Sequence, residues 1–244
     1  MAGGAYIRAL YRAESRGYPM MLHYHGTPLT PRAQLLTMGG ECFCVSYWTP
    51  TDIDVCMEIG QSVMLDNGAF SAFTNGAPFD IEGFTEWAGK YIGHPHWAVI
   101  PDVIDGPVER QRAMRKAWPH PRELSAPVWH MGLPIDYLLE LADEYPKICI
   151  GSTAQYWQIK SPAWCARMDE AFNALCKRRF LPWVHGLRML DLGGSEYPLA
   201  SADSVNVARN YKDTGTPPKQ MAKRINSRNN PTTWKERELQ CELL

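Results

Sequence analysis

The chain has 244 residues, 45% of them hydrophobic and 21% charged, which is enough for one sizeable core in a single domain. No apolar run approaches the roughly 20 residues that a membrane span needs, and residues 1–17 lack the apolar stretch of a signal peptide. These features argue against a membrane or secreted protein and predict a cytoplasmic one, and the seven scattered cysteines argue against a disulfide framework.

Eight short apolar runs, separated by segments with helical patterns, are the candidate strands of this chain. Several of them lack a strict alternation of polar and apolar residues, as expected for strands that are covered on both faces. In chain order they are Met20–Tyr24, Cys42–Tyr47, Ser62–Leu65, Trp97–Pro101, Pro127–His130, Lys147–Ile150, Trp183–Leu187 and Leu199–Ala202.

The segments between these runs carry helix signals. Thr30-Pro31 and Ser161-Pro162 each place a capping residue before a proline, which is typical of the first helical position. Pro134–Tyr145 gathers apolar residues on one face, as an amphipathic helix does. Eight strand–helix alternations predict an α/β fold, a single closed (β/α)8 barrel of the TIM type. A doubly wound open sheet is the alternative.

Positive charge is concentrated near the C-terminus. Residues 207–237 contain eight Lys or Arg and two acidic residues, a net of +6, so the rest of the chain carries −7. We expect the barrel to span residues 1–211, and residues 212–244 to form a short basic extension that is not an independent domain. Such a segment is often only a solvated face, but the asymmetry favours contact with a nucleic-acid backbone. The candidate contacts are Arg209, Lys219, Lys223, Arg224 and Arg228.

Active sites of such barrels lie at the carboxyl ends of the strands. Asp66, Asp102 and Asp203 stand at three of these ends. Each could merely cap a helix, but three carboxylates from three strands are expected to converge on one mouth. Further chemistry-bearing residues at strand ends are His23, His25, His130, Gly151, Ser152 and His185.

Four of these strand ends resemble motifs of the guanine and queuine transglycosylases, which exchange a purine base through a covalent ribosyl-enzyme. The matching segments are Leu65-Asp66-Asn67-Gly68-Ala69-Phe70, Ile100-Pro101-Asp102, Ile150-Gly151-Ser152 and Ala202-Asp203-Ser204-Val205. Each motif is short, but together they follow the order of the family from about residue 62 to residue 210. The resemblance therefore implies a barrel with a base-exchanging site at its mouth.

The resemblance implies a role for each matching residue. Asp203 would be the nucleophile and Asp66 the general acid and base. Cleaving an N-glycosidic bond generates an oxocarbenium-like sugar that one carboxylate can capture, while a second carboxyl protonates the departing base. Asp102 would accept hydrogen bonds from the N–H edge of guanine, which discriminates against adenine. The remaining base contacts would be stacking by Phe70 and His185, and polar contacts from His130, Gly151 and Ser152.

Departures from the family favour its compact, phage-type members, which insert 7-deazaguanines into DNA. The tRNA enzymes carry a cysteine-rich zinc site beyond the nucleophile, and here only Cys241 remains. Ala69 replaces a glycine, and His130 stands near the position of a base-reading glutamine. Cys42 and Cys44 cannot complete a zinc site alone. We therefore expect no metal and no cofactor.

The expected partners are DNA, with tRNA as the alternative, and a free 7-deazaguanine such as 7-cyano-7-deazaguanine. The location would be the host cytoplasm if a phage encodes the chain.

Two other functions remain open at the level of sequence. A metal-dependent amidohydrolase could use His23, His25, His130 and Asp203, although Gly151 occupies the position of its strand-6 histidine. A simpler interpretation of His23 and His25 is a strand-end pair that hydrogen-bonds to loop backbone. The second alternative is a catalytically inactive barrel that only binds nucleic acid.

Overall fold

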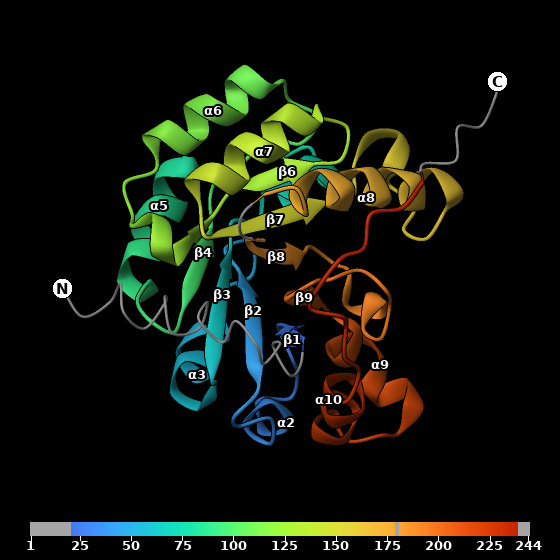
Figure 1. Ribbon diagram of the computed structural model, residues 1–244. Helices are drawn as coiled ribbons and strands as arrows, with labels where there is room; N and C mark the ends of the chain where they lie inside the picture. Colours follow the sequence, from blue (N-terminus) through green and yellow to red (C-terminus); the bar gives the residue numbers. More distant parts are fainter. Residues whose placement is uncertain (1–20, 179–180, 239–244) are drawn as a thin grey trace.

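Nine parallel strands form one sheet that curls into a nearly closed barrel (Figure 1), in a computed structural model that describes residues 21–178 and 181–238. The sheet order is β5-β4-β3-β2-β1-β9-β8-β7-β6, and every pairing is parallel. The strands are β1 (Leu22–Gly26), β2 (Cys42–Ser46), β3 (Ser62–Asp66), β4 (Trp97–Val99), β5 (Ser125–Ala126), β6 (Val128–His130), β7 (Lys147–Gly151), β8 (Trp183–Gly186) and β9 (Ser201–Ser204). Met20 and Cys241 lie outside the described residues.

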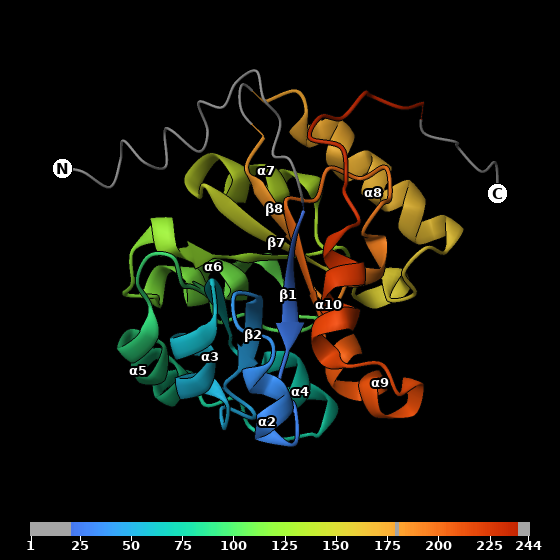
Figure 2. The same ribbon diagram turned by 90° about the horizontal axis from the view of Figure 1, so that it is seen from below.

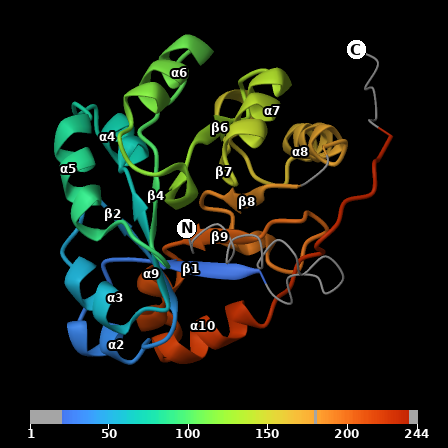
Figure 3. The same cartoon turned by 60° about the vertical axis from the view of Figure 1, so that its left-hand side comes forward.

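Helices surround the strands on the outside of the barrel (Figure 3). They are α2 (Arg32–Leu36), α3 (Ile53–Ile59), α4 (Ala69–Thr74), α5 (Ile81–Tyr91), α6 (Val108–Ala117), α7 (Ile135–Glu144), α8 (Pro162–Leu175), α9 (Asn206–Thr214) and α10 (Pro218–Asn226). Short 3-10 turns are η1 (Arg122–Leu124), η2 (Ala154–Tyr156) and η3 (Leu190–Leu192). Residues 187–200, between β8 and β9, contain η3 but no α-helix, so the predicted alternation is incomplete there. None of the helices in the described ranges has the length and apolar character required to cross a membrane.

The two edges of the sheet meet at Pro127. β5 pairs with β4 and β6 pairs with β7, yet only this residue separates β5 from β6 in the chain. Proline has no N–H to donate to a ladder, so it interrupts the strand. Its carbonyl still accepts from Cys149 N at 2.8 Å. The predicted α/β class is therefore confirmed, and an open doubly wound sheet does not fit.

Three local predictions need correction and one is confirmed. The first strand was expected at 20–24 but β1 occupies Leu22–Gly26. The last strand was expected at 199–202 but occupies 201–204, so Asp203 lies inside it. The first helix begins at Arg32 after Pro31, which is the N-cap residue and not the first helical residue. By contrast, Ser161 caps α8 as expected, because its hydroxyl accepts from Trp164 N at 3.2 Å and Pro162 follows it.

The barrel interior and the outer layer form separate apolar clusters. The outer cluster fills the space between the strands and the helices and includes Trp129, Trp164 and Phe172. The interior cluster consists of Tyr24, Cys42, Cys44, Met64, Trp97, Val99, Ala126, Val128 and Cys149. Cys42 and Cys44 thus face the same side of β2, as their spacing predicts. Because side chains fill the centre of the barrel, its chemistry is confined to the two ends.

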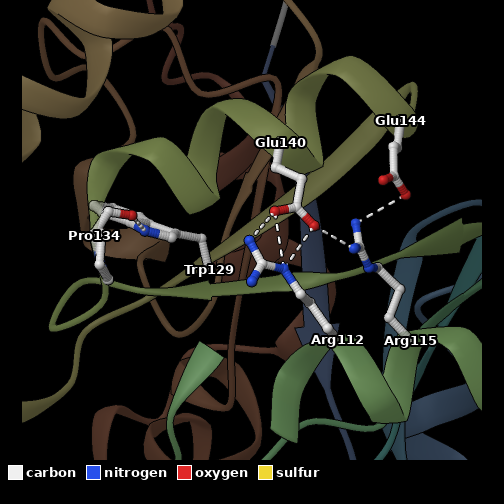
Figure 4. A network of polar contacts seen from close by, with 6 residues as sticks. All are labelled: Arg112, Arg115, Trp129, Pro134, Glu140 and Glu144. Atoms are coloured by element: carbon white, nitrogen blue, oxygen red, sulfur yellow. Dashed lines mark hydrogen bonds and ion pairs between the residues drawn. The ribbon is translucent and has the colours of Figure 1, made fainter. Parts of the chain in front are cut away.

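Charged pairs join α6 to α7 on the outer surface (Figure 4). Arg112 Nε lies 3.0 Å from Glu140 Oε2, and Arg115 Nη1 lies 2.9 Å from Glu144 Oε2. Exposed ion pairs contribute little individually, but such a network fixes how two helices pack. Trp129 Nε1 donates to the carbonyl of Pro134 at 3.1 Å, which closes the turn between β6 and α7. This turn begins directly after His130.

The C-terminal helices pack against the first strand, and Figure 2 shows α9 and α10 beside β1. Tyr211 on α9 and Ala222 and Ile225 on α10 are buried. The boundary expected at residue 211 falls inside α9, because this helix continues to Thr214. The described part of the basic extension therefore lies on the barrel wall.

Candidate active site

A pocket of about 690 Å³ opens at the carboxyl ends of the strands. Its wall contains Gly26 at the end of β1, Ser46 at the end of β2 and Gly151 at the end of β7. Parallel strands place their carboxyl ends at one face of a barrel, which is why residues far apart in the sequence meet here. Seven of the residues singled out from the sequence line this pocket: Asp66, Phe70, Asp102, His130, Gly151, Asp203 and Arg209.

Asp66 is the last residue of β3 and stands in an environment that favours its protonated form. Burial raises the pKa of this carboxyl to about 6, against a hydrogen bond from Ser46 that lowers it, and the charges of Asp203 and Asp102 raise it further. Gly68 N donates to Asp66 Oδ2 at 3.2 Å. A carboxyl with a pKa near 6 can both give up and take back a proton near neutral pH.

Gly68 is required by the turn that follows Asp66. Its φ of 78° is left-handed, and a Cβ atom there would lie 3.1 Å from Trp48 N. Glycine is the residue that adopts this conformation without steric cost. The turn also starts α4 and so directs Phe70 towards the pocket.

Asp203 is held through one of its two oxygens. Oδ1 accepts a hydrogen bond from the backbone N–H of Arg188 at 2.7 Å and lies 3.2 Å from His185 Nε2. No hydrogen bond from residues 21–178 or 181–238 reaches Oδ2. The carboxylate is therefore held at Oδ1, and Oδ2 is available on the pocket side.

His185 does not have the stacking role expected from the sequence. The ring is fully buried, does not line the pocket, and contacts Tyr24 and Trp97 edge-on inside the barrel. The strand continues to Gly186, so His185 points into the barrel interior below Asp203 and cannot sandwich a base. The prediction is corrected: His185 contacts Asp203.

Asn67 orients Asp102. Its side-chain N–H donates to Asp102 Oδ1 at 2.6 Å and to the carbonyl of Ile100 at 2.9 Å, and its own oxygen accepts from Ala69 N at 2.8 Å. This leaves Asp102 Oδ2 beside the ring of His130, whose Nε2 lies 2.8 Å away. Asn67 was missed as a functional residue, although its place after Asp66 in the motif was a signal.

His130 is buried against the pocket with unused hydrogen-bonding capacity. Nε2 is occupied by the contact with Asp102, whereas Nδ1 has no hydrogen-bond partner among the described residues. Buried polar atoms are nearly always paired in folded proteins. A polar ligand in the pocket would supply the partner that the protein does not.

Phe70 has one ring face covered. The guanidinium of Arg188 lies over it, with Cζ 3.5 Å from the ring centroid, and the side chain of Phe70 is 39% exposed. Arg188 has a φ of 58°, which is unusual for a residue with a side chain. A base can stack on Phe70 on its other face or after Arg188 moves. No sequence motif indicated Arg188, because its position over Phe70 depends on the backbone conformation after β8.

Ser152 does not line the pocket. Its hydroxyl accepts from Trp164 Nε1 at 2.9 Å and so connects β7 to α8. The neighbours Gly151 and Thr153 line the pocket in its place. Ser152 is therefore not placed to contact a base, contrary to the prediction. Its hydrogen bond instead holds the end of β7 against α8.

The basic residues of the C-terminal segment separate into two groups. Arg209 lines the pocket, whereas Lys219, Lys223, Arg224 and Arg228 do not. Lys219 lies 2.7 Å from Glu41 Oε1 and donates to the carbonyl of Gly39 at 2.7 Å. Glu41 precedes β2, at the opposite end of that strand from the pocket, so Lys219 lies away from the mouth of the barrel.

The ligand set of the amidohydrolase alternative is not assembled. His23 and His25 alternate with Tyr24, whose ring lies inside the barrel, so both histidines point outwards. Only His130 and Asp203 of that set line the pocket. In the part of the chain that the structure describes, no group of three or more His, Cys, Asp or Glu is arranged to hold a metal ion.

The outward histidines also lack the backbone partners expected for them. His25 Nε2 lies 3.2 Å from the side-chain oxygen of Asn226 on α10. His23 has no hydrogen-bond partner among the described residues, and burial, with smaller effects of His25 and Arg228, lowers its pKa to about 4. Both rings therefore belong to the interface between β1 and the C-terminal helices.

Comparisons of the chain with protein-family models, with curated proteins and with solved structures find no match. The geometry of the pocket is therefore the basis for assigning a function.

Proposed function

We propose that this chain is a base-exchanging glycosyltransferase that replaces guanine in DNA by a 7-deazaguanine through a covalent sugar–Asp203 intermediate. One observation carries the proposal: three carboxylates line one pocket, each with different partners. Asp203 is held by N–H donors, Asp66 has a raised pKa, and Asp102 is oriented by Asn67. Two carboxyl groups with different environments are what glycosidic-bond exchange requires.

The reaction has two mirrored halves. In the first, Asp203 Oδ2 forms a bond to the sugar C1′ while the bond from C1′ to the guanine N9 breaks, and protonated Asp66 gives its proton to the departing base. In the second, Asp66 takes a proton from the incoming base, which forms a bond to C1′ as the bond to Asp203 breaks. Asp66 thus returns to its starting state and no other reactant is consumed.

Asp102 and His130 would select the base. A carboxylate accepts from both N–H groups on the Watson–Crick edge of guanine, whereas adenine presents an acceptor at the matching position. His130 Nδ1, which has no hydrogen-bond partner among the described residues, supplies a further polar contact beside it. The incoming base is a free 7-deazaguanine such as 7-cyano-7-deazaguanine, and the open face of Phe70 stacks on it.

The fold supports this proposal if β5 and β6 are counted as one strand interrupted at Pro127. The sheet order begins with β5 and ends with β6, so joining them would give the eight strands of a (β/α)8 barrel, with η3 in place of a helix between β8 and β9. Active sites at the carboxyl ends of the strands are typical of that barrel.

The polymer is proposed to be DNA, with tRNA as the alternative. The chain lacks the cysteine set of the zinc-containing tRNA enzymes beyond Asp203. A target nucleotide must leave the duplex to reach a buried carboxylate, and this unstacking costs a few kcal/mol. Arg188 and Arg209 line the pocket and are the cations available to hold a flanking phosphate.

An exchange assay tests the proposal. Incorporation of labelled guanine into duplex DNA and into tRNA is measured for the wild type and for Asp203→Asn, Asp66→Asn and Asp105→Asn. We expect no exchange by Asp203→Asn and a loss of roughly 10²- to 10⁴-fold for Asp66→Asn, the usual size of a proton-transfer contribution. Asp105→Asn is the matched control, because Asp105 does not line the pocket and asparagine accepts its φ of 54°.

Two outcomes would contradict different parts of the proposal. Full exchange by an Asp203→Ala variant would exclude the covalent mechanism. Efficient exchange on tRNA but not on DNA would support the exchange mechanism but contradict DNA as the substrate.

A further inference from the structure

A chain of polar contacts runs from Trp183, at the start of β8, to Asp203. Trp183 and His185 come from β8, and Ser201 and Asp203 come from the neighbouring strand β9. Trp183 Nε1 lies 2.7 Å from Ser201 Oγ, and His185 Nδ1 lies 2.8 Å from the same oxygen. The other ring nitrogen, His185 Nε2, lies 3.2 Å from Asp203 Oδ1.

The chemistry of these groups sets the direction of each hydrogen bond. An indole N–H can only donate, so Ser201 Oγ accepts from Trp183. A carboxylate oxygen can only accept, so His185 Nε2 donates to Asp203 Oδ1, which leaves Nδ1 of the neutral ring to accept the hydroxyl proton of Ser201. A neutral imidazole that accepts at one nitrogen carries its proton on the other. The proton of His185 is therefore on Nε2 and is donated to Asp203.

We propose that His185 is a positioning residue for Asp203, held by Trp183 and Ser201 as the neutral tautomer with its proton on Nε2. This inference rests on the proposed function, in which Asp203 is the nucleophile. Two donors, His185 Nε2–H and the backbone N–H of Arg188, then converge on Oδ1. They stabilise the negative carboxylate and fix its rotation, so Oδ2 faces the sugar.

The surroundings of His185 favour its neutral form. The ring is fully buried, and burial lowers its pKa, against the hydrogen bond and charge of Asp203, which raise it. Lys147 on β7 is the cation that faces this region, and burial lowers its own pKa to about 7. Tyr24 and Trp97 enclose the ring with edge-on contacts. A charged imidazolium would have to be desolvated beside these groups.

The tautomer is measured directly by ¹⁵N NMR of histidine-labelled wild-type protein, with His185→Gln used to assign the signal. We expect the shifts of a neutral ring protonated on Nε2 at pH 7. A ring protonated on Nδ1, or an imidazolium, would overturn the inference. This measurement needs no substrate, so its outcome is independent of whether the chain exchanges bases.

Kinetics test the positioning role. His185→Leu removes the donor to Asp203, whereas His185→Gln retains an N–H at about the same distance along the side chain. We expect His185→Leu to lower kcat for exchange by roughly 10- to 100-fold, the loss of one hydrogen bond to a charged group, with the KM for the free base unchanged. His185→Gln should recover most of that loss.

Equal losses in His185→Leu and His185→Gln would contradict positioning by an N–H donor and indicate a packing role. A rise in the KM for the free base with unchanged kcat would instead return His185 to the base-binding surface. Asp203→Asn could retain exchange while His185 carries its proton on Nε2. The proposed function would then be contradicted, and the hydrogen-bond chain would be a structural feature without a role in exchange.

Discussion

Asp66 and Asp203 are the same amino acid at strand ends that share one pocket, yet their partners differ. Asp203 is contacted by two nitrogen groups on one oxygen, whereas Asp66 is half-buried beside two other carboxylates. Desolvation disfavours the charged form of a carboxyl, and a nearby negative charge adds to this effect. The difference assigns the proton-transfer role to Asp66.

The raised pKa of Asp66 predicts how stability depends on pH. A folded-state pKa of about 6 lies above the ordinary 3.8, so the stabilisation is complete below pH 3.8 and is lost as the pH rises through 6. Asp66→Asn removes this dependence. At pH 8 we expect the variant to be more stable than the wild type by about 1–3 kcal/mol, and at pH 4.5 this gain should fall to about a third.

Urea denaturation at the two pH values measures this change, with Asp105→Asn as the control. An Asp66→Asn effect of equal size at pH 8 and pH 4.5 would show that Asp66 is not the origin of the dependence. A variant that is more stable and inactive is the usual signature of an active-site residue.

At the scale of elements, the positive charge of the pocket comes from the segment after β8 and from α9. Arg188 follows β8 and Arg209 lies on α9, and both line the pocket. α10 also carries Lys223 and Arg224, but its buried residues pack it on β1 and α9. The charge of α10 is therefore on the barrel wall and not in the pocket.

This separation predicts the salt dependence of DNA binding. Replacing Arg188 and Arg209 together by alanine should weaken binding and flatten the slope of log K against log salt by about 0.9 for each phosphate that is no longer neutralised. The matched control replaces Lys223 and Arg224, which removes the same charge from α10. Titrations over a range of salt concentrations distinguish the two. A flatter slope in the control alone would restore the basic extension as the DNA-binding surface.

Element positions were only partly predictable from the sequence. The periodic apolar runs located the strands, because burial on both faces leaves a strong compositional pattern. The strand at 201–204 was missed by two residues, since the apolar Leu199 was taken as its start. Burial on both faces also hides which face of a strand points into the barrel, since apolar residues occupy both. This is why the inward direction of His185 and the outward direction of His23 were not predicted.

For the whole molecule, the nearly closed barrel explains why the motif residues share a pocket. Asp66, Asp102 and Asp203 come from strands β3 and β9 and the segment after β4, and closure brings these ends to one face. The ordered motifs in the sequence predicted this convergence. They could not predict Arg188, whose contact depends on backbone torsions, and they marked the position of Asn67 but not its contact with Asp102, which follows the neighbouring strand.

The covalent intermediate is the most direct test of the central claim. The wild-type protein is incubated with a guanine-containing duplex oligonucleotide, denatured, digested and mapped by mass spectrometry, and released guanine is quantified. We predict an oligonucleotide linked to the peptide that contains Asp203, with one guanine released for each adduct, and no adduct in Asp203→Asn. Exchange that proceeds with no adduct, or with the adduct on any residue other than Asp203, would contradict the account.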